Sequence, residues 1–203
     1  LASPLHDLSE RSLFSAHMVQ HVLLTLVAPP LLLAGTPGWM IRPLVRIPLV
    51  RGPLRLLTSP LIAFLFFNVV FGVSHVPRLY DLILGDHPLH IVEHLVFLAS
   101  AILAWWPILS PLPELPRLPY PLQVLYLFLQ TIPGSIVGAM ITLADDPLYA
   151  VYAAAPRVWG ISPIADQQIG GLIMWVGGGT YFLIAATTVF FIWAAREDTH
   201  ATV

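Results

Sequence analysis

Residues 88–109 read PLHIVEHLVFLASAILAWWPIL, an apolar run in which Glu93 is the one residue of the Asp, Glu, Lys and Arg types. A helix needs roughly 20 mostly apolar residues to cross the hydrocarbon core of a bilayer. The run is apolar throughout rather than alternating between apolar and polar residues, which favours a helix over a strand of a membrane barrel. The sequence therefore predicts a membrane-spanning helix here.

Four further stretches share this character, and together they predict the fold. The five predicted spans are residues 13–35, 60–76, 88–109, 121–144 and 166–195. We therefore expect an all-α, polytopic transmembrane helical bundle that forms a single integral-membrane domain over residues 1–203. Residues 1–4, LASP, are typical of the exit from a hydrophobic segment and are not a signal peptide, so we expect a truncated N-terminus with one more span upstream.

The composition excludes several classes of protein. Hydrophobic residues make up 57% of the 203 residues and charged residues 10%, and the mean hydropathy is +0.81. Soluble domains contain about 25% charged residues, so this chain is not a soluble enzyme. A net charge of −2 without any lysine gives no basic surface for nucleic acid. The absence of cysteine excludes disulfides, thiolate metal sites and covalent haem attachment.

Proline and glycine predict local features inside the spans. The pairs Pro29-Pro30 and Pro133-Gly134 lie inside the first and fourth spans and are expected to kink them. Gly170, Gly171 and the run 177–179 are expected to let the fifth span approach its neighbours closely.

The arginines predict the orientation of the chain. On one side of the predicted membrane lie Arg42, Arg46, Arg51, Arg55, Arg117 and Arg196. On the other side lie Arg11, Arg78 and Arg157. Because positive residues are enriched in short cytoplasmic loops, we expect the first and third loops and the C-terminus to be cytoplasmic.

Two regions are expected at the membrane surfaces. Arginines spaced four or five residues apart among apolar residues predict that residues 42–55 lie along the inner lipid interface. Tyr149, Tyr152 and Trp159 are interpreted as an aromatic belt at the outer surface.

Two histidine pairs share one pattern, HMVQH at residues 17–21 and HIVEH at residues 90–94. The spacing i, i+4 places His17 with His21, and His90 with His94, on one face of a helix, where each pair can chelate an ion. Both pairs lie in the outer halves of their spans, and ionisable groups inside spans usually serve a function. Gln20 and Glu93 lie on the same faces and are expected to accept the spare ring N–H and orient the imidazoles.

Further residues could complete such a metal site. His75, at the outer end of the second span, is a candidate ligand or a helix-end cap, and Met18 is a candidate thioether ligand or a packing residue. Imidazole and thioether donors without thiolate suit copper better than calcium or magnesium. Glu93 and Asp166 are candidates for ligands, for partners that orient ligands, or for proton carriers, and Asp166 also fits the first turn of its own helix.

Three segments resemble the polytopic CtaG family of cytochrome c oxidase assembly factors. They are SLFSAHMVQHVLLTLVAPPLLLAGTP at 12–37, SHVPRLYD at 74–81 together with the helix beginning HPLHIVEH at 87, and DQQIGGLIMWVGGG at 166–179. The resemblance implies a bacterial inner-membrane protein that matures haem–copper oxidases by copper delivery. The resemblance implies a functional role directly for four residues of the quoted motifs, His17, His21, His90 and His94. It implies such a role more weakly for His75 and Asp166.

These observations predict an assembly factor in the bacterial inner (plasma) membrane, not an enzyme, that holds copper as Cu(I) in a histidine cluster on the periplasmic side. The expected partners are cytochrome c oxidase subunits and the lipid bilayer, with no nucleic acid; the sequence sets no oligomeric state. Two alternatives stay open. One is a non-haem di-iron oxidase or hydroxylase, which needs more histidines and carboxylates than are present here. The other is a b-type haem electron-transfer protein with axial histidines from two helices.

Overall fold

The computed structural model describes residues 8–9 and 12–201, and every regular element among them is a helix. The predicted all-α fold class is confirmed. Arg11, used above for the orientation, lies outside the described residues. The elements are α2 (Phe14–Val22), η1 (Leu23–Val27), α3 (Ala28–Gly35), α4 (Gly38–Arg46), α5 (Pro48–Leu57), α6 (Pro60–Ser74), α7 (Pro77–Leu84), α8 (His87–Leu109), α9 (Tyr120–Thr142), α10 (Ala150–Ala154), α11 (Pro163–Leu172), η2 (Ile173–Gly178) and α12 (Gly179–Ala201).

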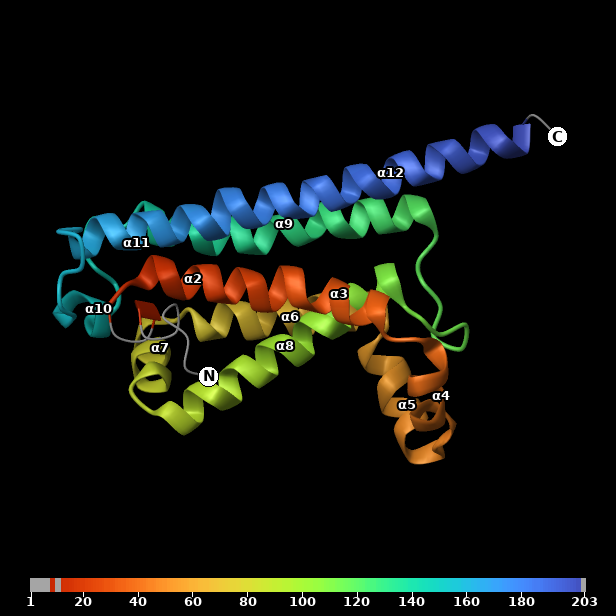
Figure 1. Cartoon of the computed structure of the whole chain (residues 1–203), viewed down its shortest axis with the longest axis horizontal. Helices are drawn as coiled ribbons and strands as arrows, with labels where there is room; N and C mark the ends of the chain where they lie inside the picture. The colour runs from red at the N-terminus through yellow and green to blue at the C-terminus, as the bar shows by residue number, and fades with distance from the viewer. Residues whose placement is uncertain (1–7, 10–11, 202–203) are drawn as a thin grey trace.

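Helices α2, α6, α9 and α12 run in roughly one direction, and α8 is inclined to them (Figure 1). Four continuous helical stretches are long and apolar enough to cross a membrane: Phe14–Gly35, His87–Leu109, Tyr120–Thr142 and Pro163–Asp198. Helices α5 and α6 together would make a fifth crossing, bent by 73° at the break between them. The molecule is therefore a multi-pass membrane protein with four or five crossings.

The first span contains a π-helical turn where the sequence predicts a proline kink. The turn η1 ends just before Pro29 and Pro30. The carbonyl of Thr25 lies four residues before Pro29 and five before Pro30, and neither proline has an N–H to donate to it. Nε1 of Trp105, on α8, donates to this carbonyl instead, at 3.1 Å. The irregular turn is thus stabilised by a bond between two spans.

Small residues bring α11 against its neighbours. A Cβ added to Gly138 of α9 would lie 2.8 Å from the backbone nitrogen of Trp175, and one added to Gly170 or Gly171 would overlap Phe14 or Thr142. The close approach predicted for Gly170 and Gly171 is confirmed. The same prediction for residues 177–179 is wrong, because an added Cβ at Gly177 would meet nothing within 4 Å and those at 178 and 179 would make ordinary contacts.

The two ends of the bundle differ. At one end α4 and α5 project sideways from the long helices, and at the other α7 and α10 cover the helix ends (Figure 1). Helices α4 and α5 expose Arg46, Arg51 and Arg55 together with large apolar side chains such as Leu49, which is 85% exposed. A surface that is basic and apolar at once suits the lipid interface predicted for residues 42–55.

Candidate metal centre

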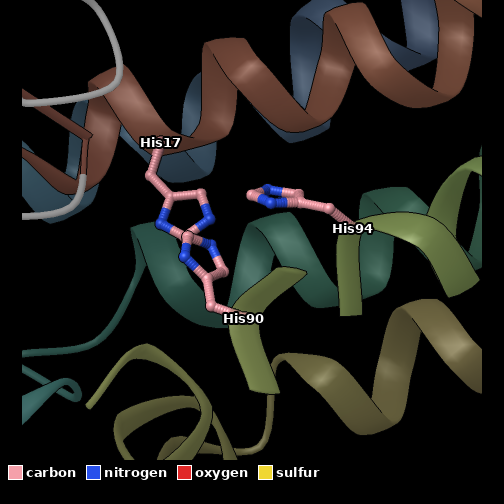
Figure 2. A group of neighbouring side chains, drawn as sticks. All are labelled: His17, His90 and His94. Carbon is pink, nitrogen blue, oxygen red and sulfur yellow. The ribbon is translucent and has the colours of Figure 1, made fainter. Parts of the chain in front are cut away.

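The two histidine pairs meet inside the bundle, at the end covered by α7 and α10. His17 and His21 come from α2, and His90 and His94 come from the first two turns of α8. The ring centre of His17 lies 5.1 Å from that of His90 and 5.8 Å from that of His94. In Figure 2 the three rings approach one another from the two helices. His17 and His90 are each 1% exposed.

The donor atoms of these side chains are close enough to share an ion. One nitrogen each of His17, His90 and His94 lies within 4.8 Å of the others, and the same holds for donor atoms of His17, His21 and Glu93. Two imidazoles bound end-on to one ion, with metal–nitrogen bonds of about 2 Å, place their ring centres roughly 5 to 6.5 Å apart. The rings of His90 and His94, 4.2 Å apart, would open by about 1 Å to fit this range.

The ring of His17 is oriented by two buried tyrosines. Its Nδ1 lies 2.8 Å from the Tyr152 hydroxyl and 2.9 Å from the Tyr80 hydroxyl. Tyr152 donates its one proton to the carbonyl of Ser9, so its oxygen can only accept from His17. We infer that Nδ1 of His17 carries the proton and that Nε2 carries the lone pair. A lone pair on Nε2 is what binding a metal ion requires.

Burial keeps the hydroxyl of Tyr80 protonated. It raises the pKa of the Tyr80 hydroxyl well above its ordinary value, and the neighbouring Tyr152 adds to this shift. Tyr80 in turn donates to Tyr152 at 3.4 Å. The hydroxyls therefore form a neutral chain from α7 through α10 to the carbonyl of Ser9, with His17 attached to it.

His21 contacts His17 directly. The two Nε2 atoms lie 2.8 Å apart. Since Nε2 of His17 accepts, Nε2 of His21 donates, and the lone pair of His21 is on Nδ1. That Nδ1 is buried and has no hydrogen-bond partner among the described residues.

His75 lies beside His21, with ring centres 5.9 Å apart. It follows the last residue of α6, and its Nδ1 donates to the carbonyl of Phe71 at 2.7 Å. Its Nε2 is therefore an acceptor, and within the described parts of the chain this buried atom has no partner. His75 thus caps a helix end, one of the two roles that the sequence left open, while its role as a ligand stays a prediction.

Glu93 and Gln20 lie beside the histidines. Glu93 is buried, and one carboxylate oxygen lies 3.9 Å from Nε2 of His90. This carboxylate also bonds to the side chain of Ser74 and belongs to the second donor group. Gln20 is half-buried. Nδ1 of His17 is contacted by Tyr152 and Tyr80, and the orienting role of Gln20 stays a prediction.

Met18 is fully buried in an apolar cluster with Phe14 and Met174. Its Cγ would lie 3.2 Å from a Cβ added to Gly170, so the side chain packs against α11. These contacts support the packing alternative for Met18.

Asp166 holds the helix that carries the first histidine pair. Its carboxylate accepts from the backbone nitrogens of Phe14, at 2.7 Å, and Ser15, at 3.1 Å, and from the hydroxyl of Ser15. It therefore caps the N-terminus of α2 from the first turn of another helix, α11. Asp166 fixes the position of His17 without contacting it.

Gln167, the next residue, forms hydrogen bonds with the end of α9 and the loop after it. Its Oε1 accepts from the backbone nitrogen of Leu148 at 2.6 Å, and its Nε2 donates to the carbonyl of Ile141 at 3.2 Å. The pair Asp166-Gln167 thus joins α2, α11 and the end of α9.

The predicted aromatic belt is wrong for two of its three members. Trp159 is 74% exposed, as a belt residue should be, but Tyr149 is 1% exposed and Tyr152 is 3% exposed. Sequence reasoning missed the contact of Tyr152 and Tyr80 with His17. Both tyrosines lie in short helices outside the spans, and no local pattern marks them as partners of a histidine on α2.

The chain is similar to a known family and to three mycobacterial proteins. The family model described as the cytochrome c oxidase caa3 assembly factor (Caa3_CtaG) matches residues 1–196. The uncharacterized protein Mb0105 of Mycobacterium bovis is 27% identical over 216 residues, covering 94% of this chain and 32% of the relative. Protein MT0111 of Mycobacterium tuberculosis gives the same values, and ML1998 of Mycobacterium leprae is 26% identical over 221 residues. The chain thus spans about a third of the length of these relatives, 32% in each case. No solved structure matched.

Proposed function

The chain belongs to the cytochrome c oxidase caa3 assembly factor family, and from that premise we propose that it binds Cu(I) at the histidines of α2 and α8 for delivery to the oxidase. It would act as an assembly factor, not an enzyme. The observation that carries this proposal is the convergence of His17, His90 and His94, whose donor nitrogens lie within 4.8 Å of one another inside the bundle. Ionisable side chains inside a membrane protein are costly and usually mark a functional site.

The donor set favours copper over the metals of the two alternatives. Three or four imidazoles suit Cu(I), and an ion that must be passed on is held with few ligands. A di-iron centre needs several carboxylates, and Glu93 is the one carboxylate in the donor groups of the described residues. A haem needs far more space than the cavity of about 40 Å³ beside His21, since pockets for ligands of drug size measure roughly 300–1,000 Å³.

Each residue around the ion has a distinct task in this proposal. His17, His90 and His94 bind the ion, while Glu93 and Gln20 orient the histidines or contact the ion from the side. Tyr152 holds His17 in the tautomer that has its lone pair on Nε2. Asp166 keeps α2 at the position where its histidines face α8. Loss of one ion–nitrogen bond leaves a position open for an incoming ligand of the acceptor.

We place the protein in the bacterial inner membrane, with residues 1–203 acting as one membrane domain and the histidines at the periplasmic end. One observation and one general rule support this orientation. The arginine-rich helices α4 and α5 lie at the end of the bundle opposite the histidines (Figure 1). Positive residues favour the cytoplasmic side. The partners would be subunits of a haem–copper respiratory oxidase that receive copper from outside.

The orientation can be tested with single cysteines, because the chain has none of its own. Asp86→Cys and Ser162→Cys should react with an impermeant thiol reagent when the outer envelope is open and the inner membrane is intact. Arg51→Cys and Arg117→Cys should react only after the inner membrane is opened. All four positions are exposed, so burial does not distort the comparison. Reversed labelling would remove the basis for periplasmic delivery.

The copper site can be tested on purified protein in detergent. Titration with Cu(I) against a coloured Cu(I) chelator should show one tightly bound ion per chain. His90→Ala and His94→Ala should each weaken this binding at least 100-fold, since losing a ligand costs more than the 10- to 100-fold typical of a partner behind a ligand. The matched control is His87→Ala, an exposed histidine of the same helix, which should bind as wild type does. Equal effects of His87→Ala and His90→Ala would contradict the proposal.

A further inference from the structure

A small cavity lies on the inner side of the histidine cluster. Its volume is about 40 Å³, which exceeds the roughly 30 Å³ that one water molecule occupies in the liquid. Its walls come from α2, α6, α9 and the last span, and most of them are apolar. The side chains with polar or sulfur atoms that line it include His21, Thr25, His75, Asn68, Gln130 and Met174.

Helix irregularities surround this cavity. The π-helical turns η1 and η2 contribute Thr25 and Met174 to its walls. Gly134 of α9 also lines it, directly after Pro133, and a Cβ there would meet nothing within 4 Å. π-helical turns are rare and are often found at functional sites. Three of the spans therefore depart from regular helix or lack a side chain at the same place, which keeps the space open.

Beside the cavity lie two imidazole nitrogens, Nδ1 of His21 and Nε2 of His75. Neither has a hydrogen-bond partner among the residues that the structure describes. His21 is 3% exposed and His75 is 5% exposed. Both nitrogens carry lone pairs, because the other nitrogen of each ring donates a hydrogen bond. Leaving such an acceptor buried and unbonded is unfavourable, and more so in a bundle surrounded by lipid.

From these observations we infer a second position for Cu(I), bound by Nδ1 of His21 and Nε2 of His75. This inference rests on the proposed function. The ring centres of the two residues lie 5.9 Å apart, within the range of roughly 5 to 6.5 Å for two imidazoles that share an ion. Cu(I) accepts two soft or borderline ligands. We call the position at His17, His90 and His94 the outer position and the new one the inner position.

His21 connects the two positions. When the ion is at the inner position, Nε2 of His21 donates to Nε2 of His17, as in the structure. When the ion is at the outer position, Nε2 of His17 binds it and releases this hydrogen bond. Moving inward breaks three copper–nitrogen bonds and forms two, and the charge of the ion and the protons of both rings stay unchanged. Two cations this close repel each other in a low-dielectric interior, so the positions are filled one at a time.

The experiment measures Cu(I) binding by purified protein in detergent, with a coloured Cu(I) chelator as competitor and X-ray absorption to count nitrogen neighbours. Wild type should bind one ion with three nitrogens. The double variant His90→Ala/His94→Ala should still bind one ion, at least 100-fold more weakly and with two nitrogens. Adding His75→Asn to this double variant should remove the remaining binding.

His75→Asn is chosen because its amide nitrogen can keep the bond to the carbonyl of Phe71 while nothing replaces Nε2. A second triple variant, His90→Ala/His94→Ala/His87→Ala, is the matched control and should keep the residual ion. Elution of each variant as a single species in gel filtration confirms that the bundle remains folded. His75→Gln, which can place an amide near the position of Nε2, covers the case in which His75→Asn does not fold, and it should also lose the ion.

The outcomes separate the two hypotheses. If wild type binds no Cu(I), the proposed function fails. If wild type binds one ion but His90→Ala/His94→Ala binds none, the inner position is overturned and the outer one stands. The same holds if the residual ion of the double variant survives both His75→Asn and His75→Gln.

Discussion

Two sets of buried polar side chains lie at the same end of this bundle, and they differ in how completely they are bonded. Both carboxylate oxygens of Asp166 accept hydrogen bonds from the start of α2, and both amide atoms of Gln167 are bonded to the end of α9 and the loop after it. His21 and His75 each leave one buried nitrogen without a partner within the described chain. The comparison suggests that the bonded set holds the fold and that the histidines are available to a ligand.

The largest effect expected from this contrast is on copper binding. His17→Ala removes the one side chain that belongs to both donor groups. We expect the Cu(I) affinity to fall by more than 100-fold, or about 3 kcal/mol, while the unfolding midpoint of the copper-free protein stays close to that of wild type. Chelator competition and thermal unfolding in detergent measure the two quantities. An unfolded His17→Ala protein would place this histidine in the structural set.

Asp166→Asn should give the opposite result. The amide keeps one acceptor oxygen, but its NH₂ group faces a backbone N–H that needs an acceptor, and the charge near the start of α2 is lost. We expect a loss of about 2 to 3 kcal/mol in the free energy of unfolding, measured by chemical denaturation in detergent. Protein that remains folded should bind copper with nearly wild-type affinity. A variant of normal stability that binds no copper would move Asp166 into the ligand set.

Tyr152→Phe tests a residue outside both sets, whose hydroxyl is hydrogen-bonded to the backbone of Ser9 and to His17. It removes the oxygen that accepts from Nδ1 of His17, so the ring loses its fixed tautomer. We expect the Cu(I) affinity to fall roughly tenfold, at the lower end of the range for a partner that orients a ligand. Tyr149→Phe is the matched control, because Tyr149 is as deeply buried but donates to the carbonyl of His75 instead. Similar losses in both variants would mean that the tautomer of His17 does not matter.

The smallest effect on copper binding and stability is expected from a substitution far from the proposed copper site. Trp105→Phe leaves the carbonyl of Thr25 without the donor that Pro29 and Pro30 cannot supply. We expect a loss of about 1 kcal/mol in unfolding free energy and no change in copper affinity. Trp193→Phe, which loses a bond to Glu197 at the exposed end of α12, should change neither quantity. A change in copper affinity in Trp105→Phe would show that η1 is coupled to the ligands.

The sequence predicted the helices and the two histidine pairs because both depend on local spacing. Apolar runs of sufficient length mark spans, and the i, i+4 spacing fixes which side chains share a face. A common depth in the membrane made a meeting of α2 with α8 reasonable, but several other helix arrangements satisfy the same depth. The sequence did not predict that Asp166 caps α2, because the usual capping residues lie next to the helix that they cap. Asp166 is 152 residues from Phe14.

The tyrosines were misplaced for a related reason. An aromatic residue after a span is typical of the interface, and only the folded path of the segment around α10 turns Tyr149 and Tyr152 inward. The prolines of the first span predicted a disturbance of the helix, yet the π-helical form of η1 and the donor from Trp105 depend on the neighbouring span. Contacts between distant segments thus account for most of what the sequence did not indicate.

The shortness of α6 has a consequence for the surrounding lipid. Its 15 residues extend about 22 Å, against a hydrocarbon thickness of about 30 Å. A helix that short crosses the bilayer either together with α5, as the bent pair described above, or alone where the lipid headgroups are drawn inward. His75 lies at one end of α6. If the chain binds copper as proposed, a bilayer thinned around α6 would bring the histidines closer to the aqueous phase, and bilayer thickness would then affect copper uptake.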